Sequence, residues 1–172
     1  AVALNINLEV IREFLSLSQG APGRLEPVEE GQPFKVFIDY AHTDDALKNV
    51  LTILKQVKKQ KILLLFGCGG DRDKTKRPLM ARAASQFADW IVVTSDNPRR
   101  EEPQQIINEI ESGLPQGFKN YSKILDREEA IEKIISMAQK DDIILIAGKG
   151  HENYQIFKDT ITPFNDKEMA RK

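Results

Sequence analysis

Residues 61–73 read Lys-Ile-Leu-Leu-Leu-Phe-Gly-Cys-Gly-Gly-Asp-Arg-Asp, and this stretch decides the fold. Its first half, 61–66, is almost wholly apolar, which is typical of a strand covered on both faces, as in a parallel sheet. Its second half is a glycine-rich segment that ends the strand and leads into charged residues. The stretch therefore predicts a central parallel strand with a polar loop at its carboxyl end.

The same order of apolar strand, polar loop and helix recurs on both sides of this stretch. Further apolar runs predict strands over 34–39, 90–94 and 143–147. Capping residues and amphipathic patterns predict helices that begin near residues 44, 77, 103 and 127. Strand and helix thus alternate with short connections. We predict an α/β fold with a Rossmann-like, mostly parallel, doubly wound sheet and helices on both faces.

Length and composition bound the class of protein. The chain has 172 residues, which suits one domain with a short appendage, and its net charge of −1 gives no support to nucleic-acid or membrane binding. A single cysteine excludes an internal disulfide framework, and no run of about 18 apolar residues is present. We therefore expect a cytoplasmic monomer that binds neither nucleic acid nor a membrane.

The amino-terminal segment is set off from the rest. Residues 8–17 form a credible amphipathic helix, and Gly20-Ala21-Pro22-Gly23 then interrupts the pattern strongly. We place a domain boundary there, with an appendage over 1–21 and the main domain over 22–172. The start at Ala1, without methionine, suggests a piece of a longer protein.

Polar residues follow each of the four main strands. Because the carboxyl ends of parallel strands meet at one edge of the sheet, where ligands bind in open α/β folds, we expect these residues to share a site. The four loops carry Asp39 and His42; Asp71 and Arg72; Asp96, Asn97 and Arg99; and Lys149, His151 and Glu152.

The loop after the third run, residues 95–103, is the most informative of the four. Asn97-Pro98 prevents the strand from continuing, so a carboxylate, an amide and a guanidinium from Asp96, Asn97 and Arg99 gather in one turn. Together they could bind the ammonium and the carboxylate of a free amino acid. The alternative interpretation is an ordinary Asx-Pro turn before a charged helix.

Other motifs favour simpler interpretations. Gly67-x-Gly69-Gly70 resembles a dinucleotide-binding fingerprint, but Arg72 replaces its third glycine, and Gly148-Lys149-Gly150 lacks the earlier glycine of a phosphate-binding loop. Two histidines without a third ligand do not predict a metal site. A nicotinamide or methyl-donor enzyme built around 67–70 and a stand-alone amino-acid or nucleotide-binding module stay open as alternatives.

Five motifs, in this order along the chain, resemble the C-terminal third of the Mur ligase family. The resemblance is to the branch that adds the third residue of the peptidoglycan stem peptide, and residues 1–17 look like the last helix of that family's central domain. The motifs are Pro22-Gly23-Arg24-Leu25-Glu26, Asp39-Tyr40-Ala41-His42-Thr43, Gly67-Cys68-Gly69-Gly70-Asp71-Arg72-Asp73-Lys74, Asp96-Asn97-Pro98-Arg99 and Gly148-Lys149-Gly150-His151-Glu152.

The resemblance implies an ATP-dependent enzyme that forms an amide bond. ATP would phosphorylate the D-glutamate side-chain carboxylate of UDP-MurNAc-L-Ala-D-Glu, and the amine of the incoming amino acid would attack the acyl phosphate. By resemblance, the nucleotide would be bound by Arg24, Asp39 and His42. The incoming amino acid would be bound by Arg72, Asp96, Asn97, Arg99, Gly148 and Glu152.

The same resemblance assigns no catalytic residue and no metal ligand to this chain. In the family, the central domain supplies the ATP phosphate loop, the Mg²⁺ ligands and a carbamylated lysine. We therefore expect the 172 residues to be inactive as a ligase on their own.

The substrate is expected to be meso-diaminopimelate, with L-lysine as the alternative within the family. Diaminopimelate carries an ammonium and a carboxylate at each end, whereas the far end of lysine is only an ammonium. A guanidinium such as that of Arg99 pairs with a distal carboxylate and repels an ammonium.

Two positions depart from the family pattern. Asp44 stands where proline is common, which would leave the start of a helix less rigid. Asn165 stands where aspartate is usual, which puts any role for an acid at this position in doubt.

Overall fold

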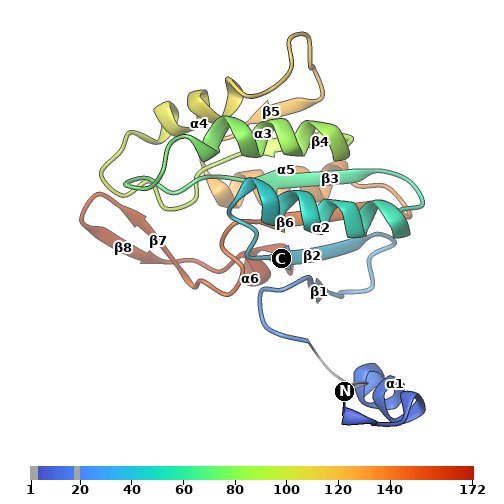
Figure 1. Ribbon diagram of the computed structural model, residues 1–172. Helices are drawn as coiled ribbons and strands as arrows, with labels where there is room; N and C mark the ends of the chain where they lie inside the picture. Colours follow the sequence, from blue (N-terminus) through green and yellow to red (C-terminus); the bar gives the residue numbers. More distant parts are fainter. Residues whose placement is uncertain (1–3, 18–19) are drawn as a thin grey trace.

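The computed structural model describes residues 4–17 and 20–172. Among these residues, no helix has the length and apolar character needed to cross a bilayer. A six-stranded sheet forms the centre of the molecule (Figure 1). In spatial order its strands are β1 (Glu26–Val28), β2 (Lys35–Asp39), β6 (Ile143–Ala147), β3 (Ile62–Phe66), β4 (Trp90–Val93) and β5 (Tyr121–Lys123).

The sheet is parallel except at one edge, which confirms the predicted fold class. The strands β2, β6, β3, β4 and β5 run parallel to their neighbours, whereas the short β1 pairs antiparallel with β2. The late strand β6 lies between β2 and β3, so that Leu145 pairs with both Phe37 and Leu64. The carboxyl ends of four consecutive strands therefore meet at one edge.

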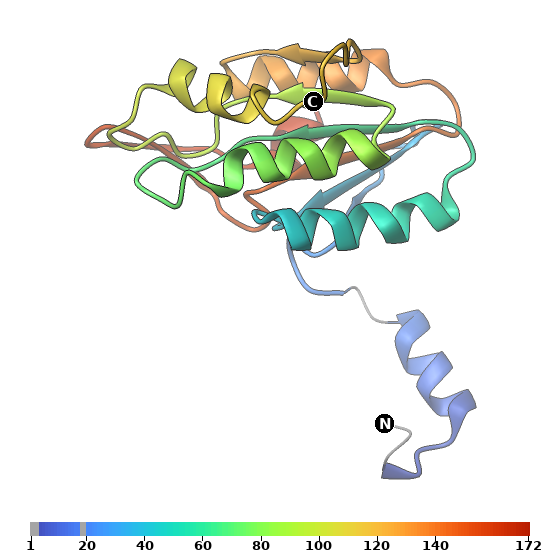
Figure 2. The same ribbon diagram turned by 45° about the horizontal axis from the view of Figure 1, so that its top comes forward.

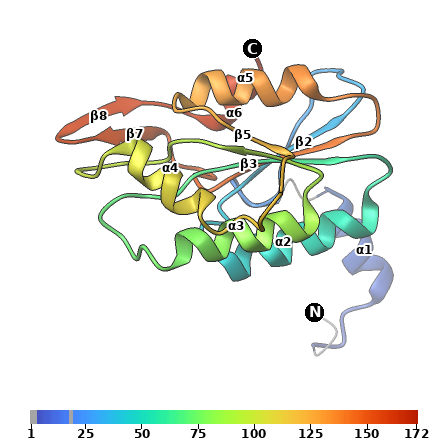
Figure 3. The ribbon, with the colours of Figure 1, turned by 90° about the horizontal axis from the view of Figure 1, so that it is seen from above.

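Helices cover both faces of this sheet, as Figure 3 shows from above. On one face lie α2 (Asp44–Val57), α3 (Lys76–Phe87) and α4 (Pro103–Glu111). On the other lie α5 (Arg127–Met137) and α6 (Asp166–Ala170). Successive side chains of a strand point to opposite faces, so Leu64 packs with α2 and α3 whereas Leu65 packs with α5. All five residues of β3 are buried, which explains the unbroken apolar run.

The helices begin where capping residues satisfy their first backbone N–H groups. The Thr43 hydroxyl accepts a hydrogen bond from the Ala46 N–H at 3.2 Å, and the Asp126 carboxylate accepts from the Glu129 N–H at 3.0 Å. Thr43 thus caps α2 although Asp44 occupies the first helical position.

A two-stranded hairpin of β7 (Tyr154–Phe157) and β8 (Thr160–Pro163) projects beside the carboxyl edge of the sheet (Figure 1). It is held to the body through Arg99, whose N–H donates to the Ile156 carbonyl at 2.9 Å.

Helix α1 (Leu8–Leu17) has no buried residue and lies apart from the sheet (Figure 2). Its apolar side chains are exposed, with Phe14 at 78% and Leu8 at 67%. The helix itself confirms the amphipathic prediction, whereas the domain boundary near Pro22 stays a prediction.

Candidate functional site

A cleft of about 530 Å³ lies at the carboxyl edge of the sheet. Every one of the four polar loops contributes to its lining, and Tyr154 of β7 adds one wall. The expectation that these loops meet at one edge is thus confirmed. The lining residues are Tyr40, His42 and Thr43; Gly69, Arg72, Asp73 and Lys76; Asp96, Asn97 and Arg99; and Gly148, Glu152 and Tyr154.

The six residues expected to bind an amino acid all line this cleft. They come from three different loops, and among them are two guanidinium groups and two carboxylates. These residues are Arg72, Asp96, Asn97, Arg99, Gly148 and Glu152. Of the three residues expected to bind a nucleotide, only His42 lines the cleft.

The loops after β3 and β4 lie backbone against backbone, and this contact explains the glycines at 67 and 70. A Cβ atom on Gly67 would overlap the Thr94 carbonyl oxygen, and one on Gly70 would overlap that of Pro98. The Gly70 N–H donates to the Asn97 carbonyl at 2.9 Å. The glycines therefore serve close packing of the two loops.

Arg99 has a constrained backbone and a fixed side chain. Its φ of 53° lies in the left-handed region, which non-glycine residues seldom adopt and which concentrates at functional sites. The backbone is held by the Ile156 carbonyl and by the Lys158 N–H, which donates to the Arg99 carbonyl at 2.6 Å. The guanidinium donates to the Gly70 carbonyl at 2.9 Å. The arginine is thus anchored at the cleft between two loops.

A buried arginine supports the loop that carries Arg72. Arg77 has a fully buried side chain and donates to Glu101, to Glu109 and to the Gly69 carbonyl. Glu101 also accepts from the Asp71 N–H at 2.7 Å. Hydrogen bonds from Arg77, Lys74 and this N–H lower the pKa of Glu101 to about 2, against a smaller opposing effect of burial.

Lys149 was expected at this edge of the sheet, but its burial was not predicted. Its side chain is fully buried behind the cleft, and its ammonium nitrogen lies 3.2 Å from Asn97 Oδ1 and 3.3 Å from Glu152 Oε2. The glycines on either side of it both have positive φ. No local pattern in the sequence predicts that this lysine is buried.

A buried ion pair lies behind two of the loops. Arg127 donates to both oxygens of Asp166 at 2.8 Å. It also donates to the carbonyl of Ala147, the last residue of β6, and to that of Ser95, which follows β4 by two residues. Asn165 caps α6 by accepting from the N–H groups of Lys167 and Glu168. Asparagine therefore caps this helix without a carboxylate.

The residues expected to contact a nucleotide gather around Tyr40. The Arg24 guanidinium lies 4.7 Å from the centre of the Tyr40 ring, and the His42 and His151 rings lie 4.6 and 5.4 Å from it. Asp39 is only 4% exposed, and its two oxygens accept from the N–H groups of Leu25 and Ala41 at 2.8 Å each. Its carboxylate thus also stabilises the local backbone.

The described residues offer neither a metal centre nor a reactive thiol. In residues 4–17 and 20–172, no group of three or more His, Cys, Asp or Glu side chains is placed to hold a metal ion. Cys68 is buried beside Met80, and burial raises the pKa of its thiol to about 12. Cys68 thus packs as a small buried side chain.

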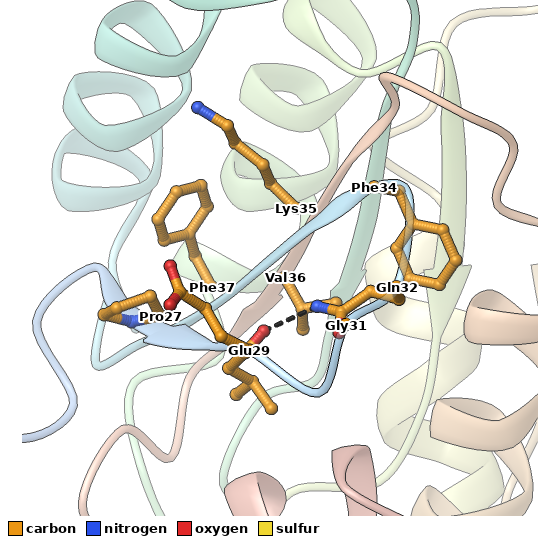
Figure 4. A pocket seen from close by; sticks show the side chains of 9 residues that line it. Pro27, Glu29, Gly31, Gln32, Phe34, Lys35, Val36 and Phe37 are labelled. Carbon is orange, nitrogen blue, oxygen red and sulfur yellow. Dashed lines mark hydrogen bonds between the residues drawn. The ribbon is translucent and has the colours of Figure 1, made fainter.

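A second hollow, of about 400 Å³, lies at the turn between β1 and β2 (Figure 4). That turn joins the amino end of β2, so the hollow lies at the opposite edge of the sheet from the cleft. Gln32 closes the turn by donating to the Val28 carbonyl at 2.7 Å. Lys35 is the only cationic side chain in its lining, and none of the four polar loops contributes.

Comparisons with known proteins agree on one family. The family described as "Mur ligase, glutamate ligase domain" matches residues 23–150. Curated relatives named UDP-N-acetylmuramoyl-L-alanyl-D-glutamate–2,6-diaminopimelate ligase include those of Geobacillus thermodenitrificans and Caldanaerobacter subterraneus subsp. tengcongensis. Each is 50% identical to this chain, over 99% and 98% of it respectively.

A solved structure of a ligase with the same name superposes with a TM-score of 0.83 at 41% identity, over 99% of this chain. The chain spans about 35% of the length of that protein and of both curated relatives. The matching region of these proteins is thus about one third of each.

Proposed function

The chain belongs to the Mur ligase family, and we propose that it is the amino-acid-binding C-terminal domain of a diaminopimelate-adding ligase. The whole enzyme would use ATP to join meso-diaminopimelate to UDP-MurNAc-L-Ala-D-Glu during peptidoglycan synthesis. The names of relatives at 50% identity support this substrate. Residues 1–21 would belong to the end of the preceding central domain and a linker.

The observation that carries the proposal is the set of charges around the cleft. Arg72 and Arg99 bring two guanidinium groups to it, and Asp96 and Glu152 bring two carboxylates. Meso-diaminopimelate is a double zwitterion, so both kinds of group find partners on it. Paired hydrogen bonds between guanidinium and carboxylate add geometric selection to attraction. The cleft would therefore bind and orient the incoming amino acid.

The backbone completes this proposed site. Gly148 has a φ of 112°, and a Cβ atom there would lie 3.0 Å from the Asp96 carboxylate. A side chain at 148 would therefore crowd the carboxylate that is proposed to meet the ligand ammonium. The Asn97 side chain is tied to Glu152 and to the Ile156 N–H, so we assign it the shaping of the site around the ligand.

The nucleotide would approach the part of the edge around Tyr40. Arg24 and His42 present a guanidinium and an imidazole there, and Asp39 retains free lone pairs on both oxygens for ribose hydroxyls. ATP supplies, when bound, the phosphoryl group that activates the glutamate carboxylate. By resemblance to the family, the Mg²⁺ ligands would come from the preceding domain of the enzyme.

The division of labour follows from these assignments. This chain would supply binding and orientation, and the preceding domains would supply the phosphate loop and the metal. We expect the 172 residues alone to form no ligation product, and the complete enzyme to act as a cytoplasmic monomer.

The decisive experiment is substrate selection by the complete enzyme. Purified enzyme is given ATP, Mg²⁺, UDP-MurNAc-L-Ala-D-Glu and either meso-diaminopimelate or L-lysine, and products are measured by mass spectrometry. We expect product with diaminopimelate and little with lysine. Efficient use of lysine would favour the alternative ligase of the same family, and absence of any product would favour a stand-alone binding module.

The assignment of Arg99 is tested in the same assay. We expect Arg99→Ala to lower kcat/KM for diaminopimelate by about 10- to 100-fold, because charge-assisted hydrogen bonds are lost. The control is Arg100→Ala, which removes an exposed neighbouring guanidinium that lies 4.0 Å from the exposed carboxylate of Asp159. Unchanged diaminopimelate turnover in Arg99→Ala would contradict the proposed role.

A further inference from the structure

We propose that Lys149 is a positioning residue that orients Glu152 and sets the net charge of the amino-acid site. The inference rests on the proposed function and deepens it. Lys149 does not line the cleft, so it acts on a ligand only through the side chains that it holds.

The ammonium of Lys149 lies within 4 Å of oxygens from three different side chains. It lies 3.2 Å from Asn97 Oδ1, 3.3 Å from Glu152 Oε2 and 3.8 Å from Asp96 Oδ1. The first two contacts are hydrogen bonds, whereas the contact with Asp96 is an ion pair. The three oxygens all belong to residues that line the cleft. One buried cation thus joins the loops after β4 and β6.

The local backbone turns this lysine inward. Strand β6 ends at Ala147, and the glycines on either side of Lys149 have φ values of 112° and 54°. A Cβ atom on Gly150 would lie 2.7 Å from that of Tyr40, so the chain at this point is pressed against the loop after β2. Burial lowers the pKa of Lys149, whereas Asp96 and Glu152 oppose that change. The buried charge depends on these partners.

The contacts leave Glu152 with one oxygen for a ligand. Its Oε2 atom accepts from the Asn97 amide at 2.8 Å and from Lys149. Within residues 4–17 and 20–172, Oε1 has no hydrogen-bond donor, and the side chain borders the cleft. Lys149 and Asn97 therefore both hold the Oε2 atom of the carboxylate and leave Oε1 available to a ligand. The free oxygen is suited to a ligand ammonium.

Lys149 also balances the charge of the part of the cleft lined by Asp96 and Glu152, here called the acidic wall. Asp96 and Glu152 together carry two negative charges, and Lys149 returns one positive charge at less than 4 Å from each. The other buried cation nearby, Arg127, is paired with Asp166. The acidic wall together with Lys149 thus has a net charge of −1, which matches one ligand ammonium. Loss of Lys149 would leave two carboxylates that repel each other and release Glu152 from its orientation.

The test is a double-mutant cycle in the complete ligase, read as KM for meso-diaminopimelate and separately as KM for ATP. The variants are Lys149→Met, Glu152→Gln and the double variant. We expect Lys149→Met to raise KM for diaminopimelate by about tenfold while KM for ATP changes less than about twofold. Because Lys149 acts through Glu152, KM for diaminopimelate in the double variant should be no more than about twofold above KM in Glu152→Gln.

Two controls keep the result interpretable. Lys133→Met makes the same chemical change at an exposed position of α5 and should leave both KM values unchanged. If Lys149→Met fails to fold, Glu152→Gln is compared with the double variant alone. That comparison removes the cation in a background that has already lost the charge of Glu152.

The outcomes separate this inference from the proposed function. Wild-type enzyme that makes no diaminopimelate product would refute the proposed function and this inference with it. Active wild type overturns the inference alone if Lys149→Met leaves KM for diaminopimelate unchanged, or raises both KM values equally. The inference is also overturned if KM for diaminopimelate in the double variant rises by the product of the two single fold-changes.

Discussion

The buried pair of Arg127 and Asp166 should be one of the most sensitive points of the fold. Both side chains are fully buried, and the guanidinium makes two hydrogen bonds to the carboxylate at 2.8 Å each. Asp166→Ala would remove one partner and leave a cation without its anion in the interior. Removal of one partner of a buried pair typically costs about 3–5 kcal/mol of unfolding free energy.

The structure supports a value inside this range. Two of the four hydrogen bonds of Arg127 go to the carbonyls of Ser95 and Ala147, which remain in the variant and still solvate the guanidinium. We therefore expect a loss of about 3 kcal/mol at pH 7. For a chain of this length, about 1 kcal/mol corresponds to a shift of roughly 2–4 °C, so Tm should fall by about 10 °C.

The assay is thermal unfolding followed by circular dichroism, with urea unfolding as a second measure. The double variant Arg127→Met/Asp166→Leu should recover most of the loss, because apolar side chains of similar volume often replace buried ion pairs without cost. The control is Glu128→Gln, which breaks the exposed pair with Lys172 and should cost less than about 1 kcal/mol.

A small effect of Asp166→Ala would refute the reasoning. A loss below about 1 kcal/mol would mean that the two carbonyls, or water that enters the site, satisfy Arg127 without its carboxylate. Failure of the double variant to recover stability would show that the packing of α6, rather than charge, is the source of the loss.

Two further predictions concern the loops of the cleft. Because the folded pKa of Glu101 is held near 2, below its usual value of 4.5, its contribution to stability is present above pH 4.5 and is lost as pH falls toward 2. Glu101→Gln should therefore have a lower unfolding free energy than wild type at pH 6, and this difference should disappear between about pH 5 and pH 2. The exposed control is Glu102→Gln. A difference that does not change with pH, or that the control reproduces, would contradict this prediction. Gly70→Ala should lower the unfolding free energy by about 1–3 kcal/mol, because its Cβ would overlap the Pro98 carbonyl oxygen. Urea unfolding measures this loss, with Gly31→Ala as the control, because a Cβ atom on Gly31 has no neighbour within 4 Å and only its positive φ is penalised. Equal losses of unfolding free energy in the two variants would mean that the two loops can move apart without cost.

Local pattern was enough to predict most of the fold. The runs 61–66 and 143–147 are apolar throughout because strands β3 and β6 are covered on both faces. The caps at Thr43 and Asp126 depend only on neighbouring N–H groups, and so the starts of these helices near residues 44 and 127 could be predicted from local sequence. Parallel topology then required the loops after four strands to share one edge, and they do.

The buried side chains that hold the loops of the cleft could not be predicted from the sequence, because they make contacts between distant parts of the chain. Arg127 and Asp166 are 39 residues apart, and Lys149 and Asn97 are 52 apart. In the sequence each of these is only a charged or polar residue, with nothing to show that it is buried.

The sequence by itself thus determined the elements, their sheet and the edge that carries the polar loops, because periodicity and capping act between near neighbours. Only the tertiary structure decided which charges are buried and what they hold. Burial of Lys149 depends on partners from two loops, and the left-handed backbone of Arg99 is held by β7. A buried charge requires partners that surround it in space, and folding alone brings them together.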